Sequence, residues 1–171
     1  MAQVDYFLMF ENVQGESQDA AINKEAGAPK GAKAIDVLSF SFTVTNNASI
    51  GSATAGAGAG KVVFGTFQFS MHVNTASPAL FATCCEGNHF NTASLFIRKA
   101  GGRQEVYLRY DFELVFITSI QTQSVDGDPI PVETVMVKYG SLKETYRAQT
   151  AAGGVGGSLQ GGWNQVTNKK L

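Results

Sequence analysis

The stretch Ile35–Thr45, IDVLSFSFTVT, decides the fold class of this 171-residue chain. Apolar and polar side chains alternate along it with a period of two residues, which is the pattern of a half-buried β-strand. One face carries Leu38, Phe40, Phe42 and Val44, and the other carries Ser39, Ser41, Thr43 and Thr45. We expect the first face to enter a core and the second face to meet water.

The same alternation predicts strands along most of the remaining chain. It occurs in Val4–Phe10, Val62–Val73, Ala93–Ile97, Val106–Ile117 and Val135–Tyr146. In the fourth of these segments we place Leu114 and Phe116 on the inward face with the earlier apolar residues. In the fifth, the apolar phase slips by one residue at Gly140-Ser141, which is what a β-bulge produces.

Three segments break the alternation and predict loops, at 14–34, 46–60 and 151–162. The last is rich in glycine, and we expect it to be flexible. Between Ser77 and Gly87 the sequence instead predicts a short helix, with Ser77 as N-cap, Pro78 in the first turn and Gly87 after the end. Its expected buried face carries three side chains at helical spacing, Leu80, Phe81 and Cys84.

These patterns together predict a single, mainly β domain over residues 1–171. The expected architecture is a β-barrel or sandwich of two sheets with one short α-helix.

Charge and hydropathy exclude several classes of protein. Thirteen Lys and Arg residues against fourteen Asp and Glu residues give a net charge of −1, whereas proteins that coat DNA or RNA usually carry a basic excess. The sequence has no run of about 18 apolar residues, so we expect no membrane insertion. Residues 1–10 lack the basic segment of a secretory signal peptide, so we expect a cytoplasmic protein that would leave the cell without a cleaved signal.

Each candidate catalytic or metal-binding motif in the sequence lacks a feature that its chemistry requires. The glycine-rich stretch Gly56–Lys61 lacks the spacing of a phosphate-binding loop and precedes a strand rather than a helix. His72 and His89 have no further ligands at metal-binding spacing, and the residue types around Asp126 and Asp128 are those of a turn. We therefore expect no enzymatic activity, no cofactor and no metal.

The polar faces of two consecutive predicted strands are almost free of charge. The side chains are Ser39, Ser41, Thr43 and Thr45 on the first strand, and Thr66, Gln68, Ser70 and His72 on the second. A solvated sheet face ordinarily carries Lys, Glu and Arg, which also block edge pairing. Two interpretations stay open: an ordinary solvent face that lacks charge, or the wall of a water-filled passage along which varied cargo slides without being held.

An ordered series of short segments resembles the haemolysin-coregulated protein (Hcp) family, the inner-tube subunit of bacterial type VI secretion. The series runs from about residue 4 to the end of the chain. It comprises QGESQD at 14–19, IDVLSFSF at 35–42, GAGKV at 58–62, ASPALF at 76–81, EGNHF at 86–90, IRKAGG at 97–102, EVYL at 105–108, DPIP at 128–131 and GGWN at 161–164.

This resemblance implies hexameric rings that stack into a hollow tube. The implied partners are other copies of the chain, a contractile sheath around the tube, a spike protein at its tip and small effectors in the lumen. Expulsion would carry the protein from the cytoplasm into the medium or a target cell. The residues that would face the lumen and its effectors are Ser39, Ser41, Thr43, Gln68 and Ser70. The 46–60 loop would reach the adjacent ring through Asn47, Ser49, Ile50, Ser52 and Thr54.

The residues alone leave one alternative, a non-enzymatic β-sandwich module that binds carbohydrate or peptide. Such a module would need aromatic platforms on its polar face. The phenylalanines here mostly share the inward set, which disfavours this alternative.

Overall fold

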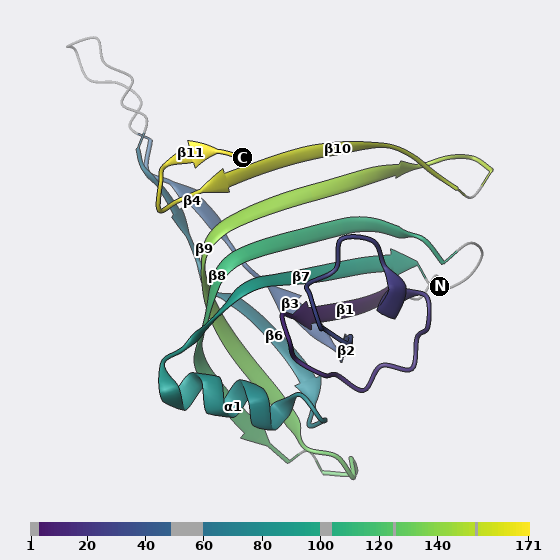
Figure 1. Ribbon diagram of the computed structural model, residues 1–171, viewed down its shortest axis with the longest axis vertical. Helices are drawn as coiled ribbons and strands as arrows, with labels where there is room; N and C mark the ends of the chain where they lie inside the picture. The colour runs from purple at the N-terminus through teal and green to yellow at the C-terminus, as the bar shows by residue number, and fades with distance from the viewer. Residues whose placement is uncertain (1–3, 49–59, 100–103, 125, 153) are drawn as a thin grey trace.

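The computed structural model describes residues 4–48, 60–99, 104–124, 126–152 and 154–171. The strands are β1 Val4–Phe10, β2 Ile35–Val37, β3 Ser39–Ser41, β4 Val44–Asn46, β5 Val62–Phe64, β6 Phe67–His72, β7 His89–Lys99, β8 Val106–Gln123, β9 Val132–Gln149, β10 Val155–Asn164 and β11 Lys169–Lys170. The helical segments are a 3-10 turn at Ile22–Lys24 and the α-helix α1 at Ser77–Glu86. Figure 1 shows their arrangement.

One antiparallel sheet curls around the core. Its order is β11-β10-β9-β8-β7-β1-β2, and β6 joins it by pairing with β9 on one side and β3 on the other, whereas β4 and β5 form a separate two-stranded ribbon. The seam between β2 and β6 is held by the Leu38 N–H, which donates to the Ser70 carbonyl at 2.8 Å. The prediction of a mainly β domain with two sheets and one α-helix is therefore confirmed within the described ranges, but the barrel does not close by a continuous ladder.

The long strands β8 and β9 bend together and take part in both layers of the fold (Figure 1). Leu114 lies at the bend with a φ of 54°, and Gly140 is its counterpart on β9. A Cβ placed on Gly140 would come within 3.2 Å of the Leu114 side chain, so the close approach of the two strands favours glycine. The predicted change of buried face at Gly140-Ser141 is present. The pairing register of β8 and β9 is continuous there, so β8 changes its buried face at the same point and no residue is inserted.

This shared bend corrects two placements on β8. Leu114 is exposed and Phe116 is only partly buried, while Val115 and Ile117 enter the core. The register shift that marks a true bulge lies further along, between Ile117 and Ser119.

The strand predicted over Ile35–Thr45 is divided into three short strands that pair with three different partners. β2 pairs with β1, β3 pairs with β6 and β4 pairs with β5. The chain bends at Leu38, whose side chain is 48% exposed, and Val44 is 51% exposed on the projecting ribbon. Placing Leu38 and Val44 in the core was therefore wrong, although Phe40 and Phe42 pack against the core as expected.

Aromatic side chains fill most of the space between the layers. Phe67 of β6 lies with its ring centroid 4.8 Å from that of Phe112 on β8. Phe64 of β5 stacks on Tyr139 of β9 at 5.3 Å. The first contact joins β6 to β8, and the second joins the β4–β5 ribbon to β9, so all four strands share one apolar core.

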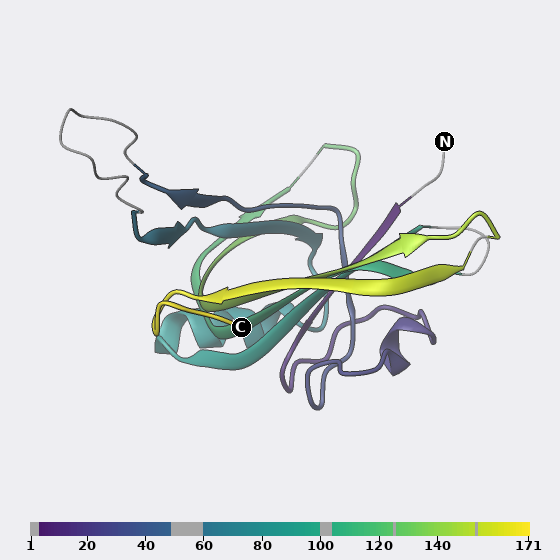
Figure 2. The same cartoon turned by 90° about the horizontal axis from the view of Figure 1, so that it is seen from above.

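The 14–34 segment covers the outer face of β1 and β7 (Figure 2). Its Ile22 packs with Phe7 and Phe96 in a second, smaller buried cluster. Arg98 of β7, only 3% exposed, forms ion pairs with Asp19 of this segment and with Asp5 of β1. The segment is largely irregular, as predicted, but the apolar cluster and the buried ion pairs fix it to the sheet.

Helix α1 packs on the core through Leu80 but not through the whole predicted face. Phe81 is 63% exposed, so placing it on the buried face was wrong. Ser77 is the first helical residue rather than the N-cap, and its hydroxyl donates to the buried Glu133 carboxylate at 2.7 Å. Gly87 follows the helix in the left-handed conformation, as predicted. None of the helices in the described ranges has the length and apolar character needed to cross a membrane.

The glycine-rich 151–162 segment also differs from its prediction. Most of it belongs to β10, which pairs with β9 from Val155 opposite Gln149 to Asn164 opposite Ser141. The glycines weaken local strand propensity, but the ladder with a long neighbouring strand overrides that preference.

Candidate functional site

Two rows of uncharged side chains, all polar except one methionine, cross the layer formed by β3, β6, β9 and β8. Residues directly opposite each other in adjacent strands share a face of the sheet, so the pairing registers define each row. The first row is Ser39, Ser70, Thr134 and Gln121, and the second is Ser41, Gln68, Met136 and Ser119. We call this surface the polar wall.

The wall is hydrophilic but carries no charge in these two rows. Ser39 and Ser41 are exposed, while Gln68 and Ser70 are partly buried. The Ser39 and Ser70 hydroxyl oxygens lie 2.6 Å apart and share a hydrogen bond. The charged groups begin beyond the rows, at Lys138 and at the pair formed by His72 Nδ1 and Asp128 Oδ2, 3.6 Å apart.

Four of the five residues predicted to face a lumen thus lie together on one surface. Thr43 follows the end of β3 and is exposed. Its carbonyl accepts a hydrogen bond from the Gly65 N–H at 2.8 Å. A Cβ on Gly65 would lie 2.1 Å from the Thr43 hydroxyl oxygen, so that side chain occupies the space above Gly65.

Sequence reasoning missed half of the wall. The residues it did not name come from β8 and β9: Ser119, Gln121, Thr134 and Met136. The alternation along Val132–Val137 could have placed Thr134 and Met136 on a common polar face. Local periodicity does not show, however, that this strand pairs with β6.

The predicted contact loop is only partly described. Asn47 is exposed just after β4. Ser49, Ile50, Ser52 and Thr54 lie outside the described residues.

Two tyrosine side chains behind the wall stay uncharged. Tyr139 is buried, and burial raises its pKa to about 12. Burial, reinforced by the nearby Glu144 carboxylate, also raises the pKa of Tyr110 to about 12. Both phenols are therefore neutral at any pH the protein normally meets.

Within the described ranges, no three His, Cys, Asp or Glu side chains come together in a way that could hold a metal ion.

Comparison with known proteins identifies the family. Residues 7–146, most of the chain, match the family described as "Type VI secretion system effector, Hcp". The chain is 32% identical over 163 residues to Protein hcp1 of Pseudomonas aeruginosa, with 94% of each chain covered.

Two solved structures share the fold over nearly the whole length. One, described as the structure of a type six secretion system protein, has a TM-score of 0.85 and 27% identity, covering 99% of this chain and 100% of the other. Hcp1 from Salmonella typhimurium has a TM-score of 0.73 and 26% identity with the same coverage. The chain therefore belongs to the Hcp family, the tube subunits of the type VI secretion system.

Proposed function

We propose that six copies of this chain close into a ring, that the rings stack into a hollow tube, and that the polar wall lines its lumen. The number six is the one that family membership implies. The observation that carries the proposal is the wall itself, a neutral hydrophilic face with a free strand edge on each side.

The first free edge is β3, which pairs with β6 on one side. The second is the part of β8 beyond Phe116, because β7 pairs with β8 only as far as His89 opposite Phe116. Among the described residues, β8 there pairs with β9 alone.

The two edges are suited to each other. The strands alternate in direction across β3, β6, β9 and β8, since every pair is antiparallel. A β3 edge from one copy placed beside the β8 edge of the next therefore continues the antiparallel order. Such a contact joins different surfaces of identical subunits, and it forms a ring when its rotation closes. Main-chain hydrogen bonds supply the contact.

The chemistry of the wall fits transport rather than binding. Serine, threonine and glutamine side chains keep a surface wetted, and the absence of charge in the two rows leaves no strong attachment point for a charged cargo. We infer that small effectors pass along the lumen, that a sheath surrounds the tube and that a spike protein caps it. The protein acts without catalysis, leaves the cytoplasm by expulsion, and involves no nucleic acid and no membrane insertion. Asn47, Ser49, Ile50, Ser52 and Thr54 would meet the adjacent ring.

Negative-stain electron microscopy combined with analytical ultracentrifugation tests the assembly. We expect rings with a central hole and a species of about six times the monomer mass. A monomer that persists at high micromolar concentration, without rings, would contradict the proposal. A Ser41→Cys thiol introduced into a Cys84→Ser, Cys85→Ser background should react with a small maleimide but not with one attached to a polymer too large for the central hole. Equal reaction with both reagents on intact rings would contradict the lumenal position of the wall.

A further inference from the structure

A groove of about 560 Å³ lies between the β4–β5 ribbon and the C-terminal strands. Its lining is mainly apolar and comprises Val44, Asn46, Gly60, Lys61, Val62, Phe64, Trp163 and Asn168. Val44 and Phe64 are directly opposite on the ribbon, as are Asn46 and Val62, so one face of the ribbon forms one side of the groove.

The groove is incomplete in the single chain. Val44 is 51% exposed there. The indole N–H of Trp163 is buried and has no hydrogen-bond partner among the described residues. An open apolar groove of this size indicates a contact that another molecule completes.

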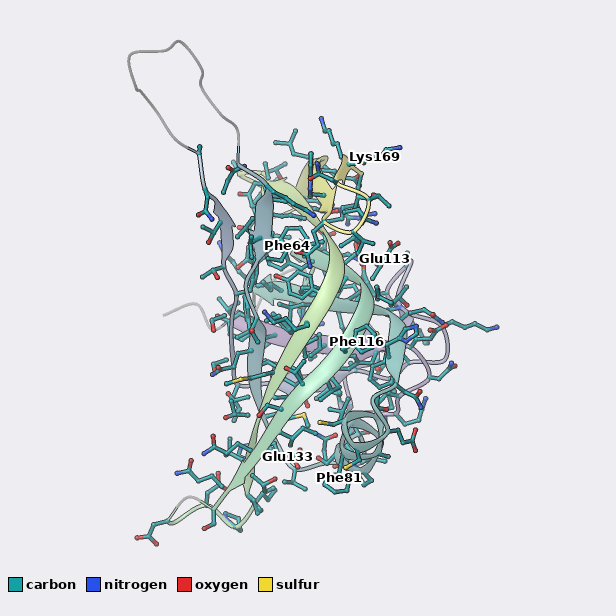
Figure 3. All side chains as sticks on the ribbon, turned by 90° about the vertical axis from the view of Figure 1, so that its left-hand side faces the viewer. Phe64, Phe81, Glu113, Phe116, Glu133 and Lys169 are labelled. Atoms are coloured by element: carbon teal, nitrogen blue, oxygen red, sulfur yellow. The ribbon has the colours of Figure 1, made fainter. Side chains whose placement is uncertain are left out.

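The opposite end of the molecule presents an apolar projection. Figure 3 shows Phe64 and Lys169 in one half of the molecule along its long axis and Phe81 in the other. Phe81 projects from α1 and is the most exposed aromatic residue there. Its neighbours on the exposed side of the helix are uncharged: Pro78, Ala79, Ala82 and Cys85.

The charges at the two ends are complementary. Lys61 lines the groove, and Lys169 and Lys170 follow Asn168 directly. The end that carries Phe81 has Glu86 at the close of α1, and Asp126 and Asp128 lie in the turn between β8 and β9 at the same end (Figure 1). Acidic side chains thus lie at the end of the molecule that carries Phe81, and lysine side chains lie beside the apolar groove.

We propose that this groove seats the Phe81 face of α1 from a second copy of this chain, and that this contact joins one ring to the next. The inference rests on the proposed ring, because each copy would use its strand edges within a ring and its two ends between rings. A contact between unlike ends of two rings is heterologous. It leaves one end of each ring free for a further ring, so the stack can extend along its axis. It assigns a polarity to the tube, with the basic groove of each ring against the acidic end of the next.

Trp163 is the only tryptophan in the chain, so its emission reports on the groove directly. Dilution of the assembled protein should be followed in parallel by sedimentation and by acrylamide quenching of Trp163. We expect the emission to shift to shorter wavelength and quenching to decrease as rings stack. Stacked rings in which Trp163 is quenched as in single rings would overturn the proposal.

Two pairs of variants separate the contact from folding and from ring closure. Phe81→Ala removes the projecting ring, with Leu159→Ala as the control, because Leu159 is also highly exposed but lies on β10. Val44→Lys places a charge in the groove, with Val63→Lys as the control, since Val63 is 53% exposed and opposite Thr45, on the other face of the ribbon.

We expect Phe81→Ala and Val44→Lys to keep single rings and to weaken stacking about 30-fold, the factor for an interface residue worth about 2 kcal/mol. The controls should stack as the unmodified chain does. Normal stacking of both test variants, or equal loss in test and control variants, would overturn the groove contact while leaving the ring intact. Failure to form rings in the unmodified chain would instead overturn the proposed function.

Discussion

Ser39 of β3 and Ser70 of β6 face each other across the ladder with hydroxyl oxygens 2.6 Å apart. One hydroxyl donates to the other, and the second keeps its own O–H for water, so the first row of the polar wall presents hydrogen-bonding groups to solvent without charge. The pair lies beside the seam where the Leu38 N–H bonds to the Ser70 carbonyl. It therefore joins the free edge strand to the body of the domain at the point where the barrel stays open.

The neutrality of the wall predicts a separation between assembly and cargo retention. Ser41→Arg adds a charge to an exposed position of the second row without touching the apolar core. We expect ring formation to persist and retention of small lumenal proteins to change, as measured by co-purification with the rings. Ser41→Asn is the matched neutral control. Loss of rings in the arginine variant alone would show that Ser41 lies in a subunit contact instead.

Arg98 predicts a large effect on stability. Replacing it by Met leaves the carboxylates of Asp19 and Asp5 without their partner under the 14–34 segment, and breaking one side of a buried pair costs about 3–5 kcal/mol. Because both carboxylates retain some exposure, we expect a loss of about 2–3 kcal/mol in urea unfolding. Lys99→Met on the same strand is exposed and should change the free energy of unfolding by less than about 0.5 kcal/mol. Equal effects of the two substitutions would contradict the assigned role of the ion pairs.

The same ion pair predicts a dependence of stability on pH. The hydrogen bond from Arg98 lowers the pKa of Asp19 below its ordinary value of 3.8, and backbone N–H groups of Ala21 and Ile22 add to this effect. A carboxylate whose pKa is lower in the folded state stabilises the fold above its unfolded pKa, and this stability is lost as the pH falls through the folded pKa. We expect unfolding free energy to decline as the pH drops below about 3.8, and Asp19→Asn to reduce that slope in acid denaturation curves. A variant with an unchanged slope would assign the acid sensitivity to other carboxylates.

The bend in β8 and β9 predicts that a side chain at Gly140 destabilises the fold. A Cβ there meets Leu114 at 3.2 Å and Val166 at 3.3 Å, and overpacking of this kind typically costs about 1–3 kcal/mol. We expect Gly140→Ala to lower the melting temperature, measured by circular dichroism. Gly161→Ala is the control, because a Cβ at Gly161 meets nothing within 4 Å. A melting temperature equal to that of the control would show that the bend relaxes without cost.

Local periodicity predicted where most strands lie, but it did not predict which strands pair with each other. The alternation over Val62–Val73 correctly placed Phe67, Phe69 and Met71 in the core. It failed at Leu38 because the chain changes partner there, and a change of partner is decided by strands distant in the sequence. The slip at Gly140 was visible in the sequence, whereas the matching conformation of Leu114 was not.

The same limit applies to the helix and to the polar wall. Helical spacing grouped Leu80 with Phe81, but only contact with the rest of the fold determines how wide the buried face of a short helix is. Ser39, Ser41, Gln68 and Ser70 could be named from two strands that are close in the sequence. Thr134 and Gln121 complete the first row through pairings of high sequence separation.

Because β8 and β9 each run through both layers, the wall and its cover are joined by covalent bonds rather than by packing alone. A load applied along the axis to one layer is carried into the other through two unbroken main chains at Leu114 and Gly140. The subunit thus resists shear between its inner and outer surfaces, which suits the expulsion that we propose for the tube.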